Sequence, residues 1–346
     1  MRRGKAAPSV TPDAVPSGLA PRRPHQRVRA LRLMLSRTAS ALFWTGRYIE
    51  RADFVSRLID ATIRLAALPS SYGGDVAAWS GALAAAGARD SFKAAHPALS
   101  EEAALQFLSL DPNNPSSMRS CIERARTNAR AVRTAMTAEG WEAINGAWLD
   151  MQRFGTALDS RPTLTRLLDS VKAAALSFDG ATHRTMLRDE AYWFLRMGAT
   201  IERADNTARL LDVKYHLLLP RDEPVGGSLD YFQWTTILRT VSALTAYRHV
   251  YRDNVKPWLV ADLLILNERM PRSLAACAGD MVRYLDLLGA MTGRRGPAHR
   301  QAVAMATTFG NARIDKIFAS GLHQAILGYL SENNRLGGLI SEQYLF

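Results

Sequence analysis

A short stretch of this 346-residue chain occurs twice, and the duplication constrains the fold more than any other feature. Residues 46–53 recur as residues 198–205, and the match continues in register to residues 60 and 212. A single Ile-Glu-Arg-Ala match can arise by chance in an Ala- and Arg-rich helix, but nine identities over fifteen positions are harder to dismiss. We therefore expect two equivalent helices with the same charged stripe. In the first copy the identical residues are Gly46, Ile49, Glu50, Arg51, Ala52, Asp53, Arg57, Leu58 and Asp60.

The repeated residues predict a narrow polar stripe on each helix. At about 100° per residue, the glycine, both acids and the arginine of a copy fall within about 80°, with apolar residues on either side. A surface helix usually has one apolar and one polar arc, so a polar stripe inside apolar territory indicates a cleft or a partner helix. Glycine inside a helix costs about 1 kcal/mol relative to alanine, so Gly46 and Gly198 suggest close approach of a backbone or a ligand.

Composition favours an all-α fold, and we expect a single large helical bundle. Ala, Leu and Arg dominate, β-branched runs are scarce, and 47% of the residues are hydrophobic. Cys121 and Cys277 suggest no disulfide framework, which favours a reduced cytoplasmic setting, and no apolar run is long enough for a membrane span. A loop at 220–228 is a possible sub-boundary. The expected helices cover 35–67, about 117–138, a segment from 140, 162–178, 187–219, 229–251, 257–269, 271–292, 297–319 and 320–343. Within 75–110 we expect short helices broken at Gly81, Gly87 and Pro97. We expect turns at 179–180 and 337–338.

The formal net charge of +12 comes mostly from the start of the chain. Residues 1–33 hold eight Lys or Arg and one acid, a contribution of +7, which leaves +5 for the rest. This proline-rich segment lacks the apolar core of a secretory signal, so we expect a disordered basic leader or an artefact of an upstream start, followed by the folded domain over 34–346. A basic arm that binds nucleic acid is the alternative.

The four acids of the two stripes allow three interpretations. They could meet across a pseudo-twofold axis and hold a cation, but neither copy adds the Glu-x-x-His pair typical of helical two-metal sites, so we expect no metal. They could line a substrate cleft, with Glu50 and Glu202 as catalytic groups. The interpretation we prefer is a buried ionic network in which arginines neutralise each acid, because unpaired buried charges are costly. The candidate network comprises Arg47, Glu50, Arg51, Asp53, Arg57, Glu202, Arg203, Asp205 and Arg209.

A second basic face lies between the two copies. Arg126, Arg130 and Arg133 follow each other at helical spacing, with Asn128 nearby. Guanidinium groups match carboxylate and phosphate geometry, so this face could bind an anionic ligand. We prefer the alternative that it pairs with the acidic stripes. No glycine-rich phosphate loop occurs, so we expect no nucleotide and no cofactor.

Several blocks together resemble the bacterial alpha-E domain family, which is defined by a helical domain with a Glu-Arg motif. The similarity runs from about residue 34 to the C-terminus. One departure is Thr127, where the family pattern leads us to expect an acid. The blocks are 34–39 with Phe43 and Trp44, 46–53, 111–117, 125–133, 141–145, 188–190, the second Glu-Arg block and 270–273.

This resemblance implies a function by association. Such proteins look like companions of a circularly permuted ATP-grasp ligase and a transglutaminase-like protease, which suggests a peptide-ligating or peptide-modifying system. We therefore expect a cytoplasmic, non-ATP-binding component of such a system, which binds a peptide or a partner ligase through an ionic cleft. The alternatives are an enzyme that uses Glu50 and Glu202 on an anionic or peptide substrate, and a basic nucleic-acid-binding helical protein.

Overall fold

Two long helices cross at the centre of the folded unit. A computed structural model describes Met1 and residues 36–67, 74–155, 158, 160–216, 227–293 and 295–346, without the side chains of 74–75 and 214–216. The chain divides into the units Met1–Leu33 and Met34–Phe346, and the second is described here. Within the described residues it forms α-helices and no strand, as the sequence predicts. The expected basic leader and most of the possible sub-boundary at 220–228 lie outside the described residues.

The central helices are α1 (Ser36–Ala66) and α8 (Glu190–His216), which carry the two copies of the repeat. They touch where the glycines lie. A Cβ atom on Gly46 would be 2.2 Å from the carbonyl oxygen of Leu195, and one on Gly198 would be 1.9 Å from that of Phe43. The expected close approach is therefore backbone against backbone, and it is the same on both sides of the crossing.

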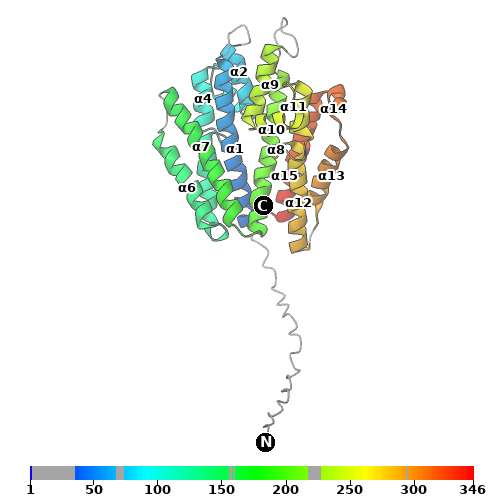
Figure 1. Ribbon diagram of the computed structural model, residues 1–346. Helices are drawn as coiled ribbons and strands as arrows, with labels where there is room; N and C mark the ends of the chain where they lie inside the picture. The colour runs from blue at the N-terminus through cyan, green and yellow to red at the C-terminus, as the bar shows by residue number, and fades with distance from the viewer. Residues whose placement is uncertain (2–35, 68–73, 156–157, 159, 217–226, 294) are drawn as a thin grey trace. The chain divides into compact units, whose positions relative to one another are not determined.

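The duplication extends well beyond these two helices. In the first half α1 packs against α5 and α7, and α6 packs against both of these; in the second half α8, α12, α15 and α13 repeat the arrangement. Figure 1 shows the first set to one side of the crossing and the second set to the other. The further members are α5 (Met118–Ala131), α6 (Ala138–Arg153), α7 (Arg161–Thr185), α12 (Leu274–Thr292), α13 (Pro297–Asn311) and α15 (Leu322–Tyr344).

The turns that lead into α5 and α12 are also duplicates. Ser117 caps α5 by accepting from the amide of Ser120 and donates to Asp111 O at 2.8 Å. Ser273 caps α12 in the same way and donates to Asn267 O at 2.6 Å. Serine is a preferred residue at this position because its oxygen satisfies an amide that the helix leaves open. The two turns deliver residues 116 and 272 to equivalent places beside the crossing.

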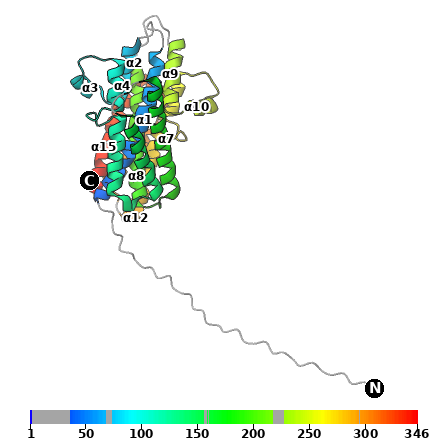
Figure 2. The same cartoon turned by 90° about the vertical axis from the view of Figure 1, so that its left-hand side faces the viewer.

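Shorter helices complete the fold around this framework. Both α2 and α9 pack against α1 and α8, which makes them equivalent too, and Figure 2 shows them at the same end of the unit. The shorter elements are α2 (Gly74–Ala85), α3 (Arg89–Ala95), α4 (Glu101–Ser109), the 3₁₀ turn η2 (Arg133–Ala135), α9 (Ser228–Thr240), α10 (Leu244–Tyr251), α11 (Pro257–Ile265) and α14 (Ile314–Ser320).

Several expected breaks are wrong. Helix α2 continues through Gly81, α7 through 179–180 and α15 through 337–338. Glycine weakens a helix by only about 1 kcal/mol, and packing on neighbouring helices outweighs that cost. Conversely, the expected helix 229–251 is interrupted at Ser242, which has a positive φ of 56°, and α12 begins at Leu274 rather than at residue 271.

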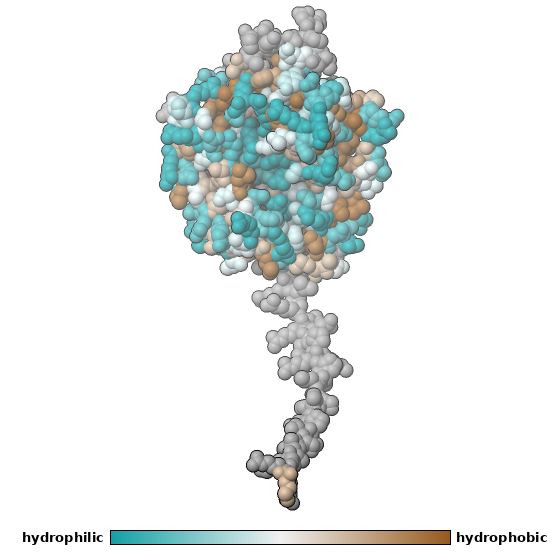
Figure 3. Space-filling view, in the orientation of Figure 1, coloured by the Kyte–Doolittle hydropathy of each residue, from teal (hydrophilic) through white to brown (hydrophobic). Residues whose placement is uncertain are grey.

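The interior consists of two apolar clusters with the Glu-Arg motifs at their junction. Along α1, Ile49 belongs to one cluster and Ala52 to the other. Along α8, Ile201 and Ala208 mark the same change. On the face seen in Figure 3 hydrophobic residues are scattered among hydrophilic ones. None of the described helices has the length and apolar character needed to span a membrane.

Candidate functional site

The glutamate of the second motif is held by two arginines of α1. Arg51 donates from Nε to Glu202 Oε1 at 2.5 Å and from Nη2 to Oε2 at 2.9 Å. Arg47 donates from Nε to Oε2 at 2.8 Å, and its guanidinium lies 4.7 Å from the centre of the Trp44 ring. Charge-assisted pairs of this kind are the strong hydrogen bonds of proteins. Glu202 is thus neutralised although it is almost fully buried.

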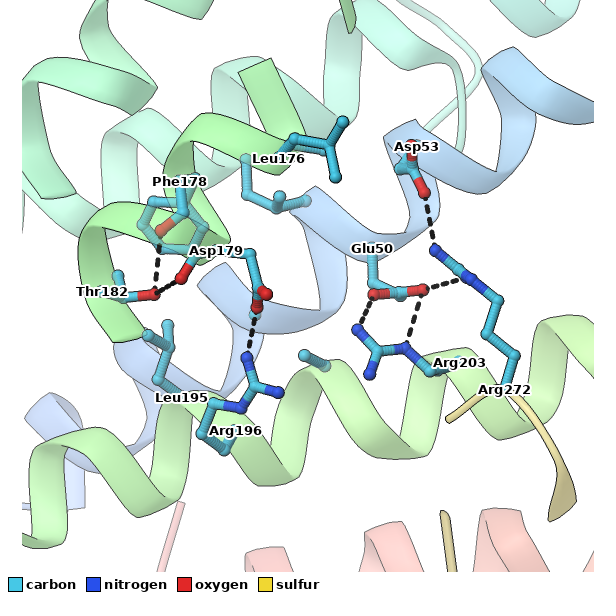
Figure 4. A pocket seen from close by; sticks show the side chains of 14 residues that line it. Glu50, Asp53, Leu176, Phe178, Asp179, Thr182, Leu195, Arg196, Arg203 and Arg272 are labelled. Atoms are coloured by element: carbon cyan, nitrogen blue, oxygen red, sulfur yellow. Dashed lines mark hydrogen bonds and ion pairs between the residues drawn. The ribbon is translucent and has the colours of Figure 1, made fainter. Parts of the chain in front are cut away.

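The glutamate of the first motif is held from the other side of the crossing (Figure 4). Arg203 donates from Nη2 to Glu50 Oε2 at 2.7 Å and from Nε to Oε1 at 3.2 Å. Arg272, from the turn before α12, donates from Nη1 to Glu50 Oε1 at 2.6 Å. Both glutamates therefore accept from two guanidinium groups.

The two Glu-Arg motifs interlock reciprocally. The arginine of each motif binds the glutamate of the other, so Glu50 pairs with Arg203 and Glu202 pairs with Arg51. Successive residues of a helix point about 100° apart, and neighbours in sequence do not face each other. Neither motif can therefore neutralise its own glutamate, and the close crossing at the glycines brings the partner arginine within reach.

The second arginine at each glutamate breaks this symmetry. Arg47 lies where α8 has Ala199, and Arg272 lies where the turn before α5 has Ser116. Ser116 keeps a place in the site, since its Oγ is 3.4 Å from Arg51 Nη1. One half thus supplies the extra charge from its helix, and the other half supplies it from its turn.

The aspartates of the two copies also differ. Asp53 accepts from Arg57 Nε at 2.9 Å through both oxygens and from Arg272 Nη2 at 3.0 Å. Asp205 accepts only from Arg209 Nε, at 2.6 Å through Oδ2, and its buried Oδ1 has no hydrogen-bond partner among the described residues. The second copy is therefore left with an unsatisfied carboxylate oxygen.

The surroundings set the protonation of these acids. Burial alone would raise the pKa of Glu50, but the charges and hydrogen bonds of Arg203 and Arg272 outweigh it, and its pKa falls to about 2. Burial opposes Arg51 and Arg47 at Glu202 in the same way, and the pKa of Glu202 is lowered. Carboxylates held in this form are poor general bases, because an efficient base needs a pKa near the working pH.

Asp205 and the two cysteines behave differently. Burial raises the pKa of Asp205, and the attraction of Arg209 only partly offsets this. Burial also raises the pKa of both thiols, Cys121 and Cys277, to about 12, and both are free. A thiol that keeps its proton is a weak nucleophile.

Each glutamate lies beside its own cavity. The cavity at Glu50 measures about 90 Å³, is also lined by Asp179 and Arg196, and appears in Figure 4. The cavity at Glu202 measures about 160 Å³ and is also lined by Asp205. The idea that all four acids share one site is wrong, because the ion pairs of the described residues form two separate clusters, one around Glu50 and Asp53 and one around Glu202 and Asp205. In the described part of the chain no group of three His, Cys, Asp or Glu side chains has an arrangement that could hold a metal ion.

The basic face of α5 lies outside the ionic centre, which corrects the expectation that it neutralises the acidic stripes. Helix α5 meets α1 through its buried stripe, which includes Ile122 and Ala125, and Arg126 and Arg130 lie outside that stripe. Arg126 donates to Asn145 Oδ1 at 2.8 Å, and Arg133 lies 4.9 Å from the centre of the Trp141 ring. Arg130 is exposed, and Asn128 is half-buried.

Arg272 and Ser116 are the site residues that the sequence interpretation did not assign. Arg272 stands within a block that carries the family resemblance, but nothing there indicated its partner. The sequence does carry a signal for their equivalence. Leu, an Asp or Asn, Pro, Ser and Cys follow each other at the same spacing in residues 110–121 and in residues 266–277. This second repeat places residues 116 and 272 at equivalent positions.

The fold and the site define a class of protein, a duplicated all-helical domain with interlocked Glu-Arg pairs at its centre. Residues 34–345 match the Alpha-E family, described as a predicted alpha-helical domain with a conserved ER motif. The match covers nearly the whole chain, and the protein belongs to the Alpha-E family.

Curated relatives extend this comparison without adding an activity. The uncharacterized proteins Mb2597 of Mycobacterium bovis and Rv2567 of Mycobacterium tuberculosis are each 25% identical to this chain over 191 residues. The match covers 48% of this chain and 21% of each relative, so the chain spans about a fifth of the length of these proteins. No solved structure matches the chain.

Proposed function

We propose that this protein is a cytoplasmic, non-ATP-binding component of a peptide ligation or modification system. In this role it binds a peptide or a partner ligase of the ATP-grasp type through the clefts beside its ionic centre. The partnership rests on the family resemblance and the association it implies. The binding role rests on the site itself, as follows.

The observation that carries the proposal is the saturation of both motif glutamates beside an open basic cavity. Glu50 and Glu202 are each held by two guanidinium groups, so their charge serves to join the two halves. At the same time Arg47 and Arg209 line the cavity beside Glu202, and their terminal nitrogens form no hydrogen bond with the described residues. A rigid centre with free donors at its edge suits recognition of an anionic partner.

The observed geometry gives little support to an enzyme that uses Glu50 and Glu202. A carboxylate with a pKa of about 2, such as Glu50, has little tendency to take up a proton near neutral pH. For an enzyme, Asp205 is the better candidate, because its pKa is raised and one of its oxygens is unpaired in a cavity. The nucleic-acid alternative depends on residues 1–33, which lie outside the described residues, and it stays a prediction.

The test is a reconstituted reaction. ATP-dependent ligation of peptides by a purified ATP-grasp ligase is measured with and without the protein, together with direct binding. We expect a changed rate, product or affinity, and a smaller change with Arg209→Gln than with the native chain. Arg64→Gln is the control, because Arg64 is exposed and pairs only with Asp60. If the protein changes neither rate nor product and binds neither ligase nor peptide, the proposal fails.

A further inference from the structure

The cavity beside Glu202 is built from several segments that are distant in the sequence. It lies where α1, the end of α2, the turn before α5, α8 and α15 meet, and it measures about 160 Å³. A water molecule occupies about 30 Å³ in the liquid, so the cavity has room for a compact polyatomic ion. Its lining is mostly polar and includes Arg47, Arg51, Ser116, Glu202, Asp205, Asn206, Arg209 and Asn334.

Two guanidinium groups present unused donors there. Arg47 uses Nε for Glu202, and Arg209 uses Nε for Asp205, and the described residues offer no hydrogen-bond partner to the terminal nitrogens of either. Stacking of Arg47 on Trp44 fixes the plane of its guanidinium and leaves the edge free to donate. Such an edge matches the two oxygens of a carboxylate or a phosphate.

A buried amide lies at the wall of the same cavity. Asn206 is 5% exposed and lines the cavity, yet its Nδ2 has no hydrogen-bond partner in the described structure. A buried donor left unsatisfied is costly, so such groups usually have a partner. The Nδ2 atom is itself closed to solvent, so the amide lies behind the wall of the cavity.

The charge balance favours an anion. Arg47, Arg51 and Arg209 outnumber Glu202 and Asp205, and Glu202 is already neutralised by two of them. The unpaired Oδ1 of Asp205 would repel an anion when ionised. Its charge is offset by Arg209, which donates to Oδ2 at 2.6 Å, and the Oδ1 atom is buried.

The equivalent cavity in the other half, beside Glu50 and Asp53, is smaller at about 90 Å³, and Arg57 is not among its lining residues. Arg57, the counterpart of Arg209, donates to both oxygens of Asp53 and from Nη1 to Ser242 Oγ at 2.8 Å. Arg272 donates a further hydrogen bond to Oδ2 of Asp53. The duplication therefore supplies an internal control, in which the same helix position carries an arginine without free access to a cavity.

We propose that the cavity beside Glu202 binds a compact oxyanion, a carboxylate or a phosphate group, through the terminal nitrogens of Arg47 and Arg209. This site deepens the proposed function, since the terminal carboxylate of a peptide is one such group. It is tested on the full chain without any ligase, so the outcome of the ligation assay leaves it unaffected.

The experiment is titration calorimetry with three probes, namely inorganic phosphate, a tri-alanine peptide with a free carboxylate, and the same peptide amidated. We expect phosphate or the peptide with a free carboxylate to bind, and the probe that binds identifies the source of the oxyanion. The amidated peptide should bind at least tenfold more weakly than the peptide with a free carboxylate. Arg209→Gln should weaken binding about tenfold or more, because charge-assisted bonds are lost. Arg57→Gln, the matched control, should leave the affinity within twofold.

The proposal is overturned if neither oxyanion binds at millimolar concentration, if amidation makes no difference while phosphate does not bind, or if Arg57→Gln weakens binding as much as Arg209→Gln. Thermal melts verify that each variant is folded. A second readout on the native chain needs no variant. The Nε–H resonances of Arg47 and Arg209 should shift during the titration while that of Arg57 stays in place, and the reverse pattern would contradict the site.

Discussion

Glu50 and Glu202 each lie between two guanidinium groups, and this arrangement decides what each residue contributes. Four arginines hold two nearly buried carboxylates. Two come from the first copy of the repeat, one from the second copy and one from the turn before α12. A buried pair is weak evidence of net stabilisation, but removal of one partner leaves an uncompensated charge. The glutamates thus neutralise the arginines that meet at the crossing of α1 and α8.

Substitution of Glu50 should therefore destabilise the protein. We expect Glu50→Gln to lower the free energy of unfolding by about 3 kcal/mol, because Arg203 and Arg272 lose their shared acceptor charge. Urea denaturation measures the change. Asp60→Asn is the control, since its pair with Arg64 is exposed and such pairs contribute about 0–1 kcal/mol. Equal effects of the two substitutions would refute a buried network.

The same residue predicts a specific acid sensitivity. The pKa of Glu50 is about 2 in the folded state against an ordinary value of 4.5, so the unfolded chain binds the extra proton first as the pH falls. The stability from Glu50 is therefore complete above about pH 4.5 and is lost as the pH falls toward 2. Denaturation curves over this range should show a shallower pH dependence for Glu50→Gln than for the native chain. Parallel curves would contradict the lowered pKa.

At the scale of helices, the glycines set the distance between α1 and α8. Much of this could be predicted from the sequence, because glycine on a charged helical stripe occurs twice in register. The source of Arg272 could not, because it lies 222 residues from Glu50 and the repeat around it has only scattered identities at a different offset. The turn expected at 179–180 also failed, since packing of α7 on α1 and α6 outweighs a local glycine signal.

Alanine substitutions distinguish the glycines at the helix crossing from helical glycines that have open space around them. Gly46→Ala and Gly198→Ala should each cost about 2 kcal/mol or more, because the new Cβ would lie 2.2 or 1.9 Å from a carbonyl oxygen of the other helix. Gly146→Ala and Gly180→Ala place a Cβ with no atom within 4 Å and should stabilise by up to about 1 kcal/mol. Thermal and urea unfolding measure both pairs. Equal losses in all four variants would show that the crossing is not tightly packed.

At the scale of the whole folded unit, the duplication explains both the symmetry of the core and the asymmetry of the cavities. Equivalent helices surround α1 and α8, yet one half closes its aspartate with Arg57 and Arg272 while the other leaves Asp205 and Arg209 beside an open cavity. A duplicated fold can keep one copy for stability and use the other for binding. Sequence alone predicts the shared framework, but the difference depends on side chains that meet only after folding.

The central claim is that each Glu-Arg motif is completed by the other, and double-mutant cycles test it most directly. Stability is measured for Glu50→Gln and Arg203→Gln, singly and together, and for Glu202→Gln with Arg51→Gln. The account predicts coupling energies of about 1–3 kcal/mol for these pairs across the crossing, and values near zero for Glu50 with Arg51 within one motif. Coupling confined to residues of the same motif, with none across the crossing, would contradict it.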